Sequence, residues 1–308
     1  RDKVRAWFEQ VGLVNVLVDC TGESCHSGCQ QDIGEQVNVS IFVAVGTRRI
    51  PARQAVQESY AELAVSNTSC CSDSSCCSSS VISFDDIGSV VWDGGYTAGE
   101  KADLPAEAAE FSLGCGNPLA MAGLQPGETV LDIGSGGGLD ALIAARQVGS
   151  TGQVIGVDMT PAMLERARRA AQQGGFDNVQ FKHGYAEKLP VEDNLVDVII
   201  SNCVINLVED KGKVFRDAYR VLKNNGRLEV NDMVFGGAIL PAARTTAVGW
   251  AECISGALPK EEYIDLVRQA GFQDVSVRRS TSAGTSQGVP VYSIQVSARA
   301  IKPPLPVH

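Results

Sequence analysis

The stretch "ETVLDIGSGGGLDALIAARQVG", residues 128–149, decides the fold. It begins with an apolar run, continues with glycines at the alternate positions Gly134, Gly136 and Gly138, and ends in a helical pattern. Glycine suits a place where the backbone turns sharply and a ligand approaches with no Cβ in the way. The stretch therefore predicts a buried strand, a glycine turn and a helix, as in a doubly wound α/β domain.

Three more apolar runs follow, and each predicts a strand that ends at the same edge of a parallel sheet. They are residues 153–158, 179–184 and 196–203. The first ends in Asp158, about twenty residues beyond the glycines, where an acidic side chain accepts hydrogen bonds from ribose hydroxyls. Open α/β sheets bind their ligands at the carboxyl ends of their strands. We therefore expect a nucleotide-like ligand at this edge.

The C-terminal half continues the alternation of helices and strands. Residues 213–232 predict an amphipathic helix, a turn and a fifth strand, with core positions at Val214, Ala218, Val221 and Leu222. Residues 260–272 predict a helix that ends at Gly271, and 274–279 and 291–300 predict the last two strands. The whole pattern indicates a Rossmann-like, doubly wound, mostly parallel seven-stranded sheet with an N-terminal extension and a C-terminal substrate-capping region.

The N-terminal part is harder to interpret. Residues 4–12 suggest a helix, 37–45 a strand, 20–29 a cysteine-containing loop and 53–64 a helix. Residues 66–80 are rich in serine and cysteine, which cannot bury enough surface to fold alone, and predict a mobile loop. We expect four segments: an extension over 1–60, the cysteine- and serine-rich lead-in over 61–117, the cofactor domain over 118–235, and a cap with the last strands over 236–308.

Composition excludes some classes of function. The 308 residues carry a net charge of −10 with no basic stripe, which disfavours nucleic acid as a partner. No run of eighteen apolar residues predicts a membrane span. Ten cysteines in a large chain indicate metal binding or thiol chemistry in a reducing compartment more than a disulfide framework. We expect a cytoplasmic protein, and a monomer.

Four short motifs, read together, resemble the arsenite methyltransferases, a family of class I S-adenosylmethionine-dependent methyltransferases. They are "LGCGNP" at 113–118, "HGYAEKLP" at 183–190, "SNCVINLVEDK" at 201–211 and "WAECISGAL" at 250–258, and the resemblance covers residues 58–302. It is nearer the microbial form, because Ser112 and Leu113 stand where the animal form has an aromatic pair. Residues 1–50 match nothing in the family.

The resemblance implies a site for S-adenosylmethionine. Asp132, before the glycines, would help hold the methionine end, and Asp158 would hold the ribose. Ala186 and Glu187 would line the adenine pocket, with Met159 against the adenine face. The full set of cofactor-binding residues expected is Asp132, Gly134, Gly136, Gly138, Asp158, Met159, Ala186, Glu187 and Asn202.

The same resemblance implies that Cys115, Cys203 and Cys253 bind arsenic(III). Arsenic(III) is thiophilic, so three thiolates satisfy it and leave its lone pair outward as the nucleophile. Because the sulfonium methyl group is already an activated electrophile, no general base is needed. The substrates implied are arsenite and methylarsenite, with glutathione or thioredoxin as the thiol reductant.

"SCCSDSSCC" at 69–77 adds four cysteines upstream of Cys115. Family members carry a further functional cysteine N-terminal to "GCG", so Cys71 and Cys77 are candidates to capture arsenic or supply electrons. An incidental metal-binding or linker stretch is the alternative.

Each assigned residue also has an ordinary structural interpretation. A lone buried cysteine is more often a small apolar side chain than a ligand, and Asn202 equally suits a cap at a strand end. Two other functions stay open. One is methylation of another small nucleophile such as a quinol, which needs a base. The other is a thiol-rich metal-binding or sensor protein, supported by Cys20, Cys25 and Cys29.

Overall fold

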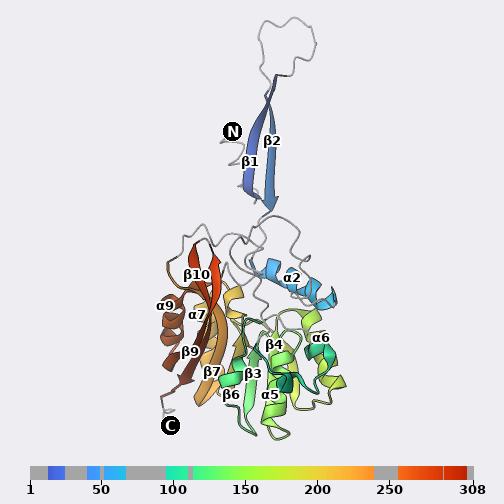
Figure 1. The fold of residues 1–308 in the computed structure, drawn as a ribbon, viewed down its shortest axis with the longest axis vertical. Coiled ribbons are helices and arrows are strands. Elements are labelled where there is room, and N and C mark those ends of the chain that lie inside the picture. Colours follow the sequence, from blue (N-terminus) through green and yellow to red (C-terminus); the bar gives the residue numbers. More distant parts are fainter. Residues whose placement is uncertain are drawn as a thin grey trace, which may run out of the picture. The chain divides into compact units, whose positions relative to one another are not determined.

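The computed structural model describes residues 13–24, 40–48, 52–66, 95–109, 114–238, 256–286 and 288–303. The chain divides into two compact units, Arg1–Pro51 and Ala52–His308 (Figure 1). In the first unit, β1 (Leu13–Ser24) pairs antiparallel with β2 (Ser40–Arg48).

The strand expected at 37–45 is confirmed over most of its length. The loop expected at 20–29 is wrong in its first part, because cross-strand pairing with β2 continues to Ser24. The helix expected at 4–12 and the cysteines Cys25 and Cys29 lie outside the described residues.

The second unit is built on one sheet with the strand order β5-β4-β3-β6-β7-β10-β9, and a two-residue β8 pairs with β7. The strands up to β7 run parallel, and β7, β10 and β9 are antiparallel neighbours. The predicted doubly wound, mostly parallel sheet is confirmed. The strands are β3 (Thr129–Ile133), β4 (Gln153–Asp158), β5 (Val179–His183), β6 (Val196–Asn202), β7 (Leu222–Phe235), β8 (Leu258–Pro259), β9 (Gln273–Ser286) and β10 (Val289–Ala300).

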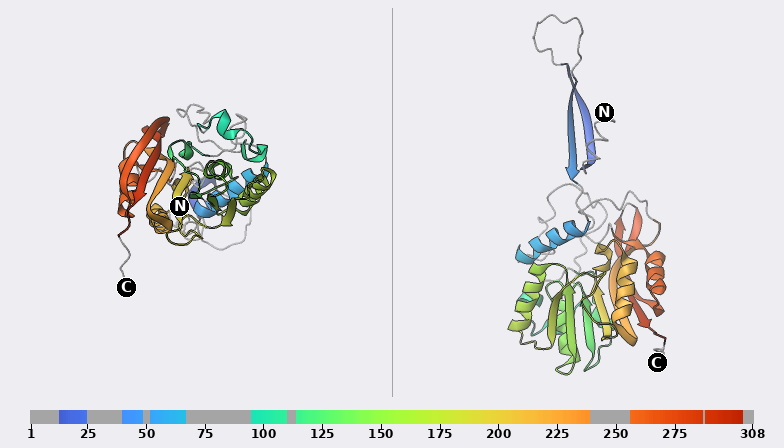
Figure 2. Two further views of the ribbon diagram at one scale, coloured as in Figure 1. Left: turned by 90° about the horizontal axis from the view of Figure 1, so that it is seen from below. Right: turned by 180° about the vertical axis from the view of Figure 1, so that it is seen from behind.

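Helices cover both faces of this sheet (Figure 2). One face packs against α5 (Leu139–Val148) and α6 (Pro161–Gln173), and the other against α7 (Lys211–Val221) and α9 (Lys260–Gln269). In β3, Val130 belongs to the apolar cluster that includes residues of α5 and α6, and Leu131 belongs to the cluster that includes residues of α7 and α9. The two differ because successive side chains of a strand point to opposite faces. The predicted core positions Val214, Ala218 and Val221 of α7 and Leu222 of β7 are all buried.

Shorter elements complete the larger unit. They are α2 (Ala52–Ser66), α3 (Ala98–Lys101), α4 (Ala106–Ala109) and the 3-10 turns η1 (Pro118–Met121) and η2 (Ile205–Leu207). The helix expected at 53–64 is therefore confirmed as α2. It packs on α6 through Ala64 and Met163. The expected cap region is described only up to residue 238 and from 256 onward.

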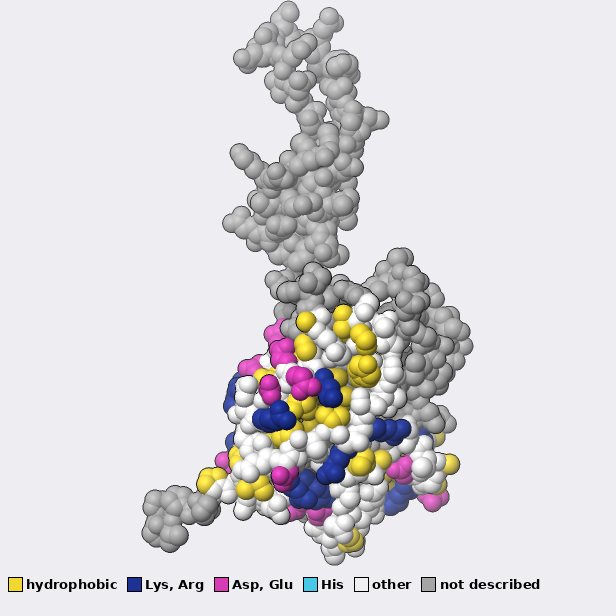
Figure 3. Space-filling view, turned by 60° about the vertical axis from the view of Figure 1, so that its left-hand side comes forward, with side chains coloured by type: hydrophobic (Ala, Val, Ile, Leu, Met, Phe, Trp, Pro, Cys, Tyr) yellow, Lys and Arg dark blue, Asp and Glu magenta, His cyan; other side chains and the backbone are white. Residues whose placement is uncertain are grey.

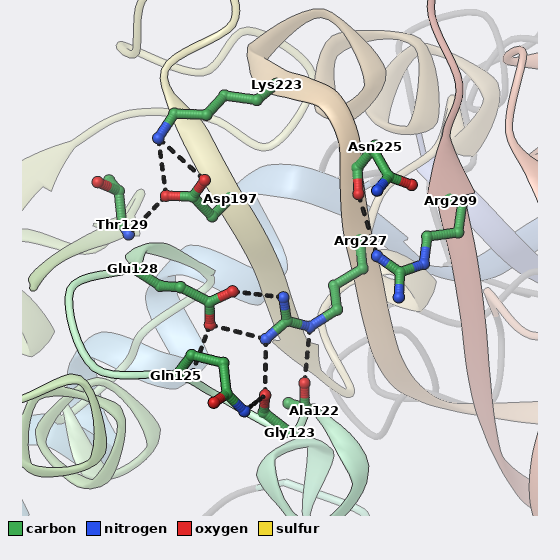
Figure 4. Close-up of polar contacts among 10 residues, drawn as sticks. All are labelled: Ala122, Gly123, Gln125, Glu128, Thr129, Asp197, Lys223, Asn225, Arg227 and Arg299. Carbon is green, nitrogen blue, oxygen red and sulfur yellow. Dashed lines mark hydrogen bonds and ion pairs between the residues drawn. The ribbon is translucent and has the colours of Figure 1, made fainter.

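The amino ends of the parallel strands are tied together by ion pairs (Figure 4). Arg227 of β7 makes a bidentate pair with Glu128, at 2.6 and 2.8 Å, and donates to the carbonyl oxygen of Ala122 at 2.7 Å. Lys223 pairs with Asp197, which also accepts a hydrogen bond from the Thr129 N–H. These contacts fix the loop that leads into β3 at one edge of the sheet, and leave the carboxyl edge for a ligand.

The surface of the larger unit mixes charges of both signs. In the face drawn in Figure 3, acidic and basic side chains alternate over the part of the chain that is described. Between Ala52 and Lys302, no described helix is long and apolar enough to cross a membrane.

Candidate active site

The glycine turn after β3 forms one wall of the candidate site. Gly134 and Gly136 have φ of 75° and 49°, a left-handed conformation that favours glycine. The N–H groups of Gly134 and Ser135 donate to the Val157 carbonyl oxygen at 2.7 and 3.0 Å, which ties the turn to β4. A Cβ on Gly134 would collide with the side chain of Val204. The turn therefore brings the backbone close to the loop after β6, as the sequence pattern requires.

Asp158 ends β4 and holds this turn. Its Oδ2 atom accepts from the Gly136 N–H at 2.9 Å, and its Oδ1 atom accepts from the Thr160 N–H at 2.8 Å. Burial raises the pKa of Asp158, and these backbone hydrogen bonds oppose that shift. Because a carboxylate oxygen has two lone pairs, both oxygens keep acceptor capacity for a ligand hydroxyl.

One pocket gathers residues from the carboxyl ends of β3, β4, β5 and β6 and from α2. Of the residues predicted from the sequence, it is lined by Gly134, Gly136, Asp158, Met159, Ala186, Glu187, Asn202 and Cys203. Of the predicted residues that the structure describes, Asp132, Gly138 and Cys115 do not line it. Predicted residues separated by up to 69 positions in sequence, from Gly134 to Cys203, thus border one space.

Asp132 lies beneath the pocket, in the body of β3. It is 2% exposed, and its Oδ2 atom has no hydrogen-bond partner. Burial and the negative charges of Asp140 and Asp158 raise its pKa well above the usual range. Gly138 precedes α5 and lies close to Ala167 and Phe181, where a Cβ would be tightly packed, so its place in the structure is a helix–sheet contact.

The helix α2 forms one wall of the pocket, which the sequence analysis did not predict. Arg53 forms an ion pair with Glu187 at 2.6 Å, and its guanidinium lies 5.0 Å from the ring centroid of Tyr185. Gln57 donates to the Met159 carbonyl oxygen at 3.1 Å. These contacts reach across more than a hundred residues and so leave no local signal. They place α2 over the segment predicted to hold adenine.

Asp140, in the first turn of α5, also lines the pocket and was missed by sequence reasoning. Burial raises its pKa to about 6, and hydrogen bonds from Tyr96 and Asn202 oppose the shift. Among the described lining residues, Asp140, Asp158, Glu187 and Glu209 are acidic and Arg53 is basic, so carboxyl groups outnumber basic groups.

Cys115 and Cys203 lie in the same buried apolar cluster, with Met233, Phe235, Ala257, Ala283 and Val291. Both are thiols. Cys203 follows β6 with a φ of 61°, an uncommon conformation for a residue with a Cβ, and its N–H donates to the Asn231 carbonyl oxygen at 2.8 Å. The Cys115 carbonyl oxygen accepts from the Ser293 hydroxyl at 2.9 Å. The fold thus brings two of the three predicted arsenic ligands together.

Tyr263 and Asp232 lie fully buried near this cluster and were not predicted as site residues. The Tyr263 hydroxyl donates to Asp232 Oδ2 at 2.8 Å. Burial and Asp232 raise the pKa of Tyr263 well above its usual value, and negative charge on Cys115 and Cys203 raises it further. The two thiols are therefore electrostatic neighbours of the same phenol.

The remaining predicted cysteines, Cys253, Cys71 and Cys77, lie outside the described residues. In the part of the chain that is described, no three Cys, His, Asp or Glu side chains are arranged to hold a metal ion.

The strand order, the glycine turn and the acidic end of β4 define a class I S-adenosylmethionine-dependent methyltransferase fold. A methyltransferase-domain family matches residues 124–271. The crystal structure of an arsenic(III) S-adenosylmethionine methyltransferase from Chlamydomonas reinhardtii is 38% identical, with a TM-score of 0.60. The match covers 67% of this chain and 73% of that one. The chain belongs to the arsenite methyltransferase family.

Curated relatives agree with this family. The arsenite methyltransferase of Halobacterium salinarum is 40% identical over 228 residues, which is 73% of this chain and 58% of the relative. The human arsenite methyltransferase is 41% identical over 152 residues, which is 46% of this chain and 40% of the relative. This chain therefore spans between two fifths and three fifths of the length of these two relatives.

The residues present fit the cofactor of this class. S-adenosylmethionine carries a net positive charge, and the pocket carries more carboxylates than cations. Ser135 Oγ, in the glycine turn, is buried with no partner and is a ready hydrogen-bonding group. The glycine turn supplies the close backbone approach that a methionine chain and ribose require.

Proposed function

We propose that this protein transfers methyl groups from S-adenosylmethionine to trivalent arsenic held by cysteine thiolates. The observation that carries the proposal is the convergence of Cys115 and Cys203 in one buried cluster, with Cys203 also lining the cofactor pocket. A thiol pair at the edge of a methyl-donor pocket suits a soft, thiophilic substrate.

The cofactor would be held by residues at the carboxyl edge of the sheet. The glycine turn and Asn202 would hold the methionine portion, with Asp132 supporting the turn from below, and Asp158 would accept from the ribose hydroxyls. Ala186, Glu187 and Met159 would enclose the adenine, and α2 would cover it through the Arg53–Glu187 ion pair. When bound, the cofactor supplies an electrophilic sulfonium methyl group.

The arsenic would be held by Cys115 and Cys203, with Cys253 as the third ligand. The apolar neighbours Met233, Phe235 and Val291 would surround the bound arsenic with apolar side chains on one side. The protein's contribution is then mainly orientation of two reactants, since the arsenic lone pair needs no deprotonation. His183 is engaged by the Met159 carbonyl oxygen at 3.1 Å and is not required as a base.

The N-terminal cysteines and a small thiol would complete the cycle. Cys71 and Cys77 would capture arsenic or return electrons once methylation has raised its oxidation state, with glutathione or thioredoxin as the reductant. We expect arsenite and methylarsenite as substrates, a cytoplasmic location that keeps the thiols reduced, and a monomer.

The test is incubation of the protein with arsenite, S-adenosylmethionine and a thiol reductant. Methylated arsenic and S-adenosylhomocysteine are the expected products. If the cofactor binds and arsenite yields no methylated product, the arsenic proposal is wrong and a methyltransferase with another substrate is favoured. If the cofactor does not bind, the assignment of the pocket itself is wrong.

A further inference from the structure

Tyr96 lies at the centre of a buried hydrogen-bond network. It is 5% exposed and precedes α3. Its hydroxyl donates to Asp140 Oδ1 at 2.5 Å and accepts from Asn202 Nδ2 at 3.0 Å. The hydroxyl thus uses both its donor and an acceptor position, and its orientation is fixed by two partners on different elements.

Asn202 extends this network in two directions. Its Nδ2 group also contacts Asp140 Oδ2 at 3.2 Å and the Gly116 carbonyl oxygen at 2.7 Å. Its Oδ1 atom accepts from the Cys115 N–H at 3.0 Å. A Cβ on Gly114 would collide with this amide, so the Gly114–Gly116 backbone lies directly against it. The amide therefore points its oxygen at the Cys115 N–H and its two N–H donors at the three acceptors, which sets the side of the amide that faces each partner.

The two ends of the network face two different parts of the site. Asp140 and Asn202 line the pocket, whereas Tyr96 does not. Cys115 carries one of the thiols near Cys203. The network therefore joins a carboxylate in the cofactor pocket to the backbone that carries a substrate ligand.

We propose that Tyr96 is a positioning residue: its hydroxyl holds Asp140 and Asn202 in the orientation that faces the cofactor and, through Asn202, fixes the Cys115 backbone. This rests on the proposed function, in which the pocket binds S-adenosylmethionine and Cys115 binds arsenic. Tyr96 itself lines neither the cofactor pocket nor the cysteine cluster, but its hydrogen bonds would fix the position of one relative to the other.

The electrostatics agree with this geometry. Burial raises the pKa of Asp140, and the Tyr96 hydrogen bond lowers it again. Removal of the hydroxyl would leave Asp140 Oδ1 buried without that donor and Asn202 with one acceptor fewer. A buried carboxylate without its donor either reorients or takes up a proton, and both changes weaken its attraction for a cationic ligand.

The experiment compares Tyr96→Phe, Asn202→Ala and the double variant with the wild-type chain. Calorimetry measures S-adenosylmethionine affinity without arsenic, and equilibrium dialysis measures arsenite affinity without cofactor. We expect Tyr96→Phe to weaken cofactor binding about tenfold, roughly 1.4 kcal/mol, and arsenite binding by a few-fold. Because Tyr96 acts partly through Asn202 and partly by its direct hydrogen bond to Asp140, the double variant should lose clearly less affinity for the cofactor than the product of the two single losses.

Tyr219→Phe is the matched control, since it removes a hydroxyl that contacts the Ile301 carbonyl oxygen at 2.8 Å, away from the pocket. It should leave both affinities unchanged. Cofactor and arsenite affinities of Tyr96→Phe within twofold of wild type, even with a lower melting temperature, would reduce Tyr96 to a structural residue and overturn the proposal. The proposal would also be overturned if the loss of cofactor affinity in the double variant equalled the product of the losses in the two single variants.

If Tyr96→Phe does not fold, the same cycle is made with Tyr96→His, whose smaller ring does not reproduce the phenol's hydrogen bonds to both Asp140 and Asn202, and cofactor affinity within twofold of wild type in that variant overturns the proposal. Failure of the proposed function looks different. Wild-type chain that binds the cofactor but not arsenite would refute arsenic methylation, while the cofactor cycle would still decide the role of Tyr96.

Discussion

The guanidinium of Arg53 lies 2.6 Å from Oε1 of Glu187, and this ion pair joins α2 to the loop after β5. The Arg53 side chain is 55% exposed and that of Glu187 is 11% exposed. The pair therefore closes the pocket at its rim rather than in its interior.

Arg53→Ala should loosen this closure and speed release of S-adenosylmethionine. Exposed ion pairs contribute up to about 1 kcal/mol, so we expect affinity to fall by about two- to fivefold. The difference from wild type should shrink at high salt. Stopped-flow dissociation at low and high ionic strength measures this. Arg268→Ala, which removes an exposed partner of Asp265 on α9, is the control, and an equal effect there would contradict a role for the α2 pair.

Asp158→Ala should weaken the cofactor more strongly, because Asp158 is both the expected ribose acceptor and the anchor of the Gly136 N–H. The loss of a charge-assisted contact predicts on the order of 1.5 to 3 kcal/mol of binding free energy. Asp158→Asn keeps one carbonyl acceptor and should fall between the alanine variant and wild type. Calorimetric titration gives both values, and unchanged affinity in the alanine variant would show that this strand end does not meet the ribose.

The sequence was sufficient to predict the pocket residues that lie at the ends of strands. The glycine turn, Asp158, Glu187 and Asn202 follow runs of apolar residues, and parallel strands bring their carboxyl ends to one edge whatever the rest of the chain does. Cys203 ends the strand predicted at 196–203 and so belongs to the same edge, whereas its role as an arsenic ligand was implied by the family resemblance. These positions are set by local patterns and by one topological rule.

The residues that were missed depend on packing between distant segments. Arg53 and Tyr96 reach the site from helices and loops whose own sequences carry no sign of where they dock. Asp132 and Asp140 show a second limit: both flank the glycines, yet only Asp140 lines the pocket, because Asp132 is inside the strand. The left-handed φ of Cys203 likewise accompanies a hydrogen bond from its N–H to the Asn231 carbonyl oxygen, a contact between residues distant in sequence.

Cys203→Ser should abolish arsenic methylation while leaving cofactor affinity within about twofold. Serine is close in size to cysteine and keeps the pocket wall, but its oxygen is a poor ligand for a soft metalloid. Product analysis with arsenite, paired with calorimetry for S-adenosylmethionine, separates the two effects. A serine variant that methylates arsenite at the wild-type rate would remove the central role assigned to this thiol.

Asp232 should make the stability of the fold depend on pH. It is fully buried, it accepts from the Tyr263 hydroxyl at 2.8 Å, and burial raises its pKa to about 7. The unfolded chain titrates this group near its ordinary value of about 3.9. Between those two values the folded state binds more protons, so the stability contributed by protonated Asp232 is lost as pH rises toward 7.

Asp232→Asn removes this titration. The free energy of unfolding of the variant, relative to wild type, should therefore rise between pH 5 and pH 7, by roughly 2 kcal/mol over that range, and then level off. Urea unfolding at pH 5, 6, 7 and 8 measures both chains. Asp265→Asn, at a carboxylate on α9 whose side chain is 58% exposed, controls for the loss of one negative charge. If the free energies of unfolding of the Asp232 variant and wild type change in parallel across these pH values, Asp232 is already ionised in the folded protein at pH 5. Its hydrogen-bond partners and nearby charges then offset the effect of burial on its pKa.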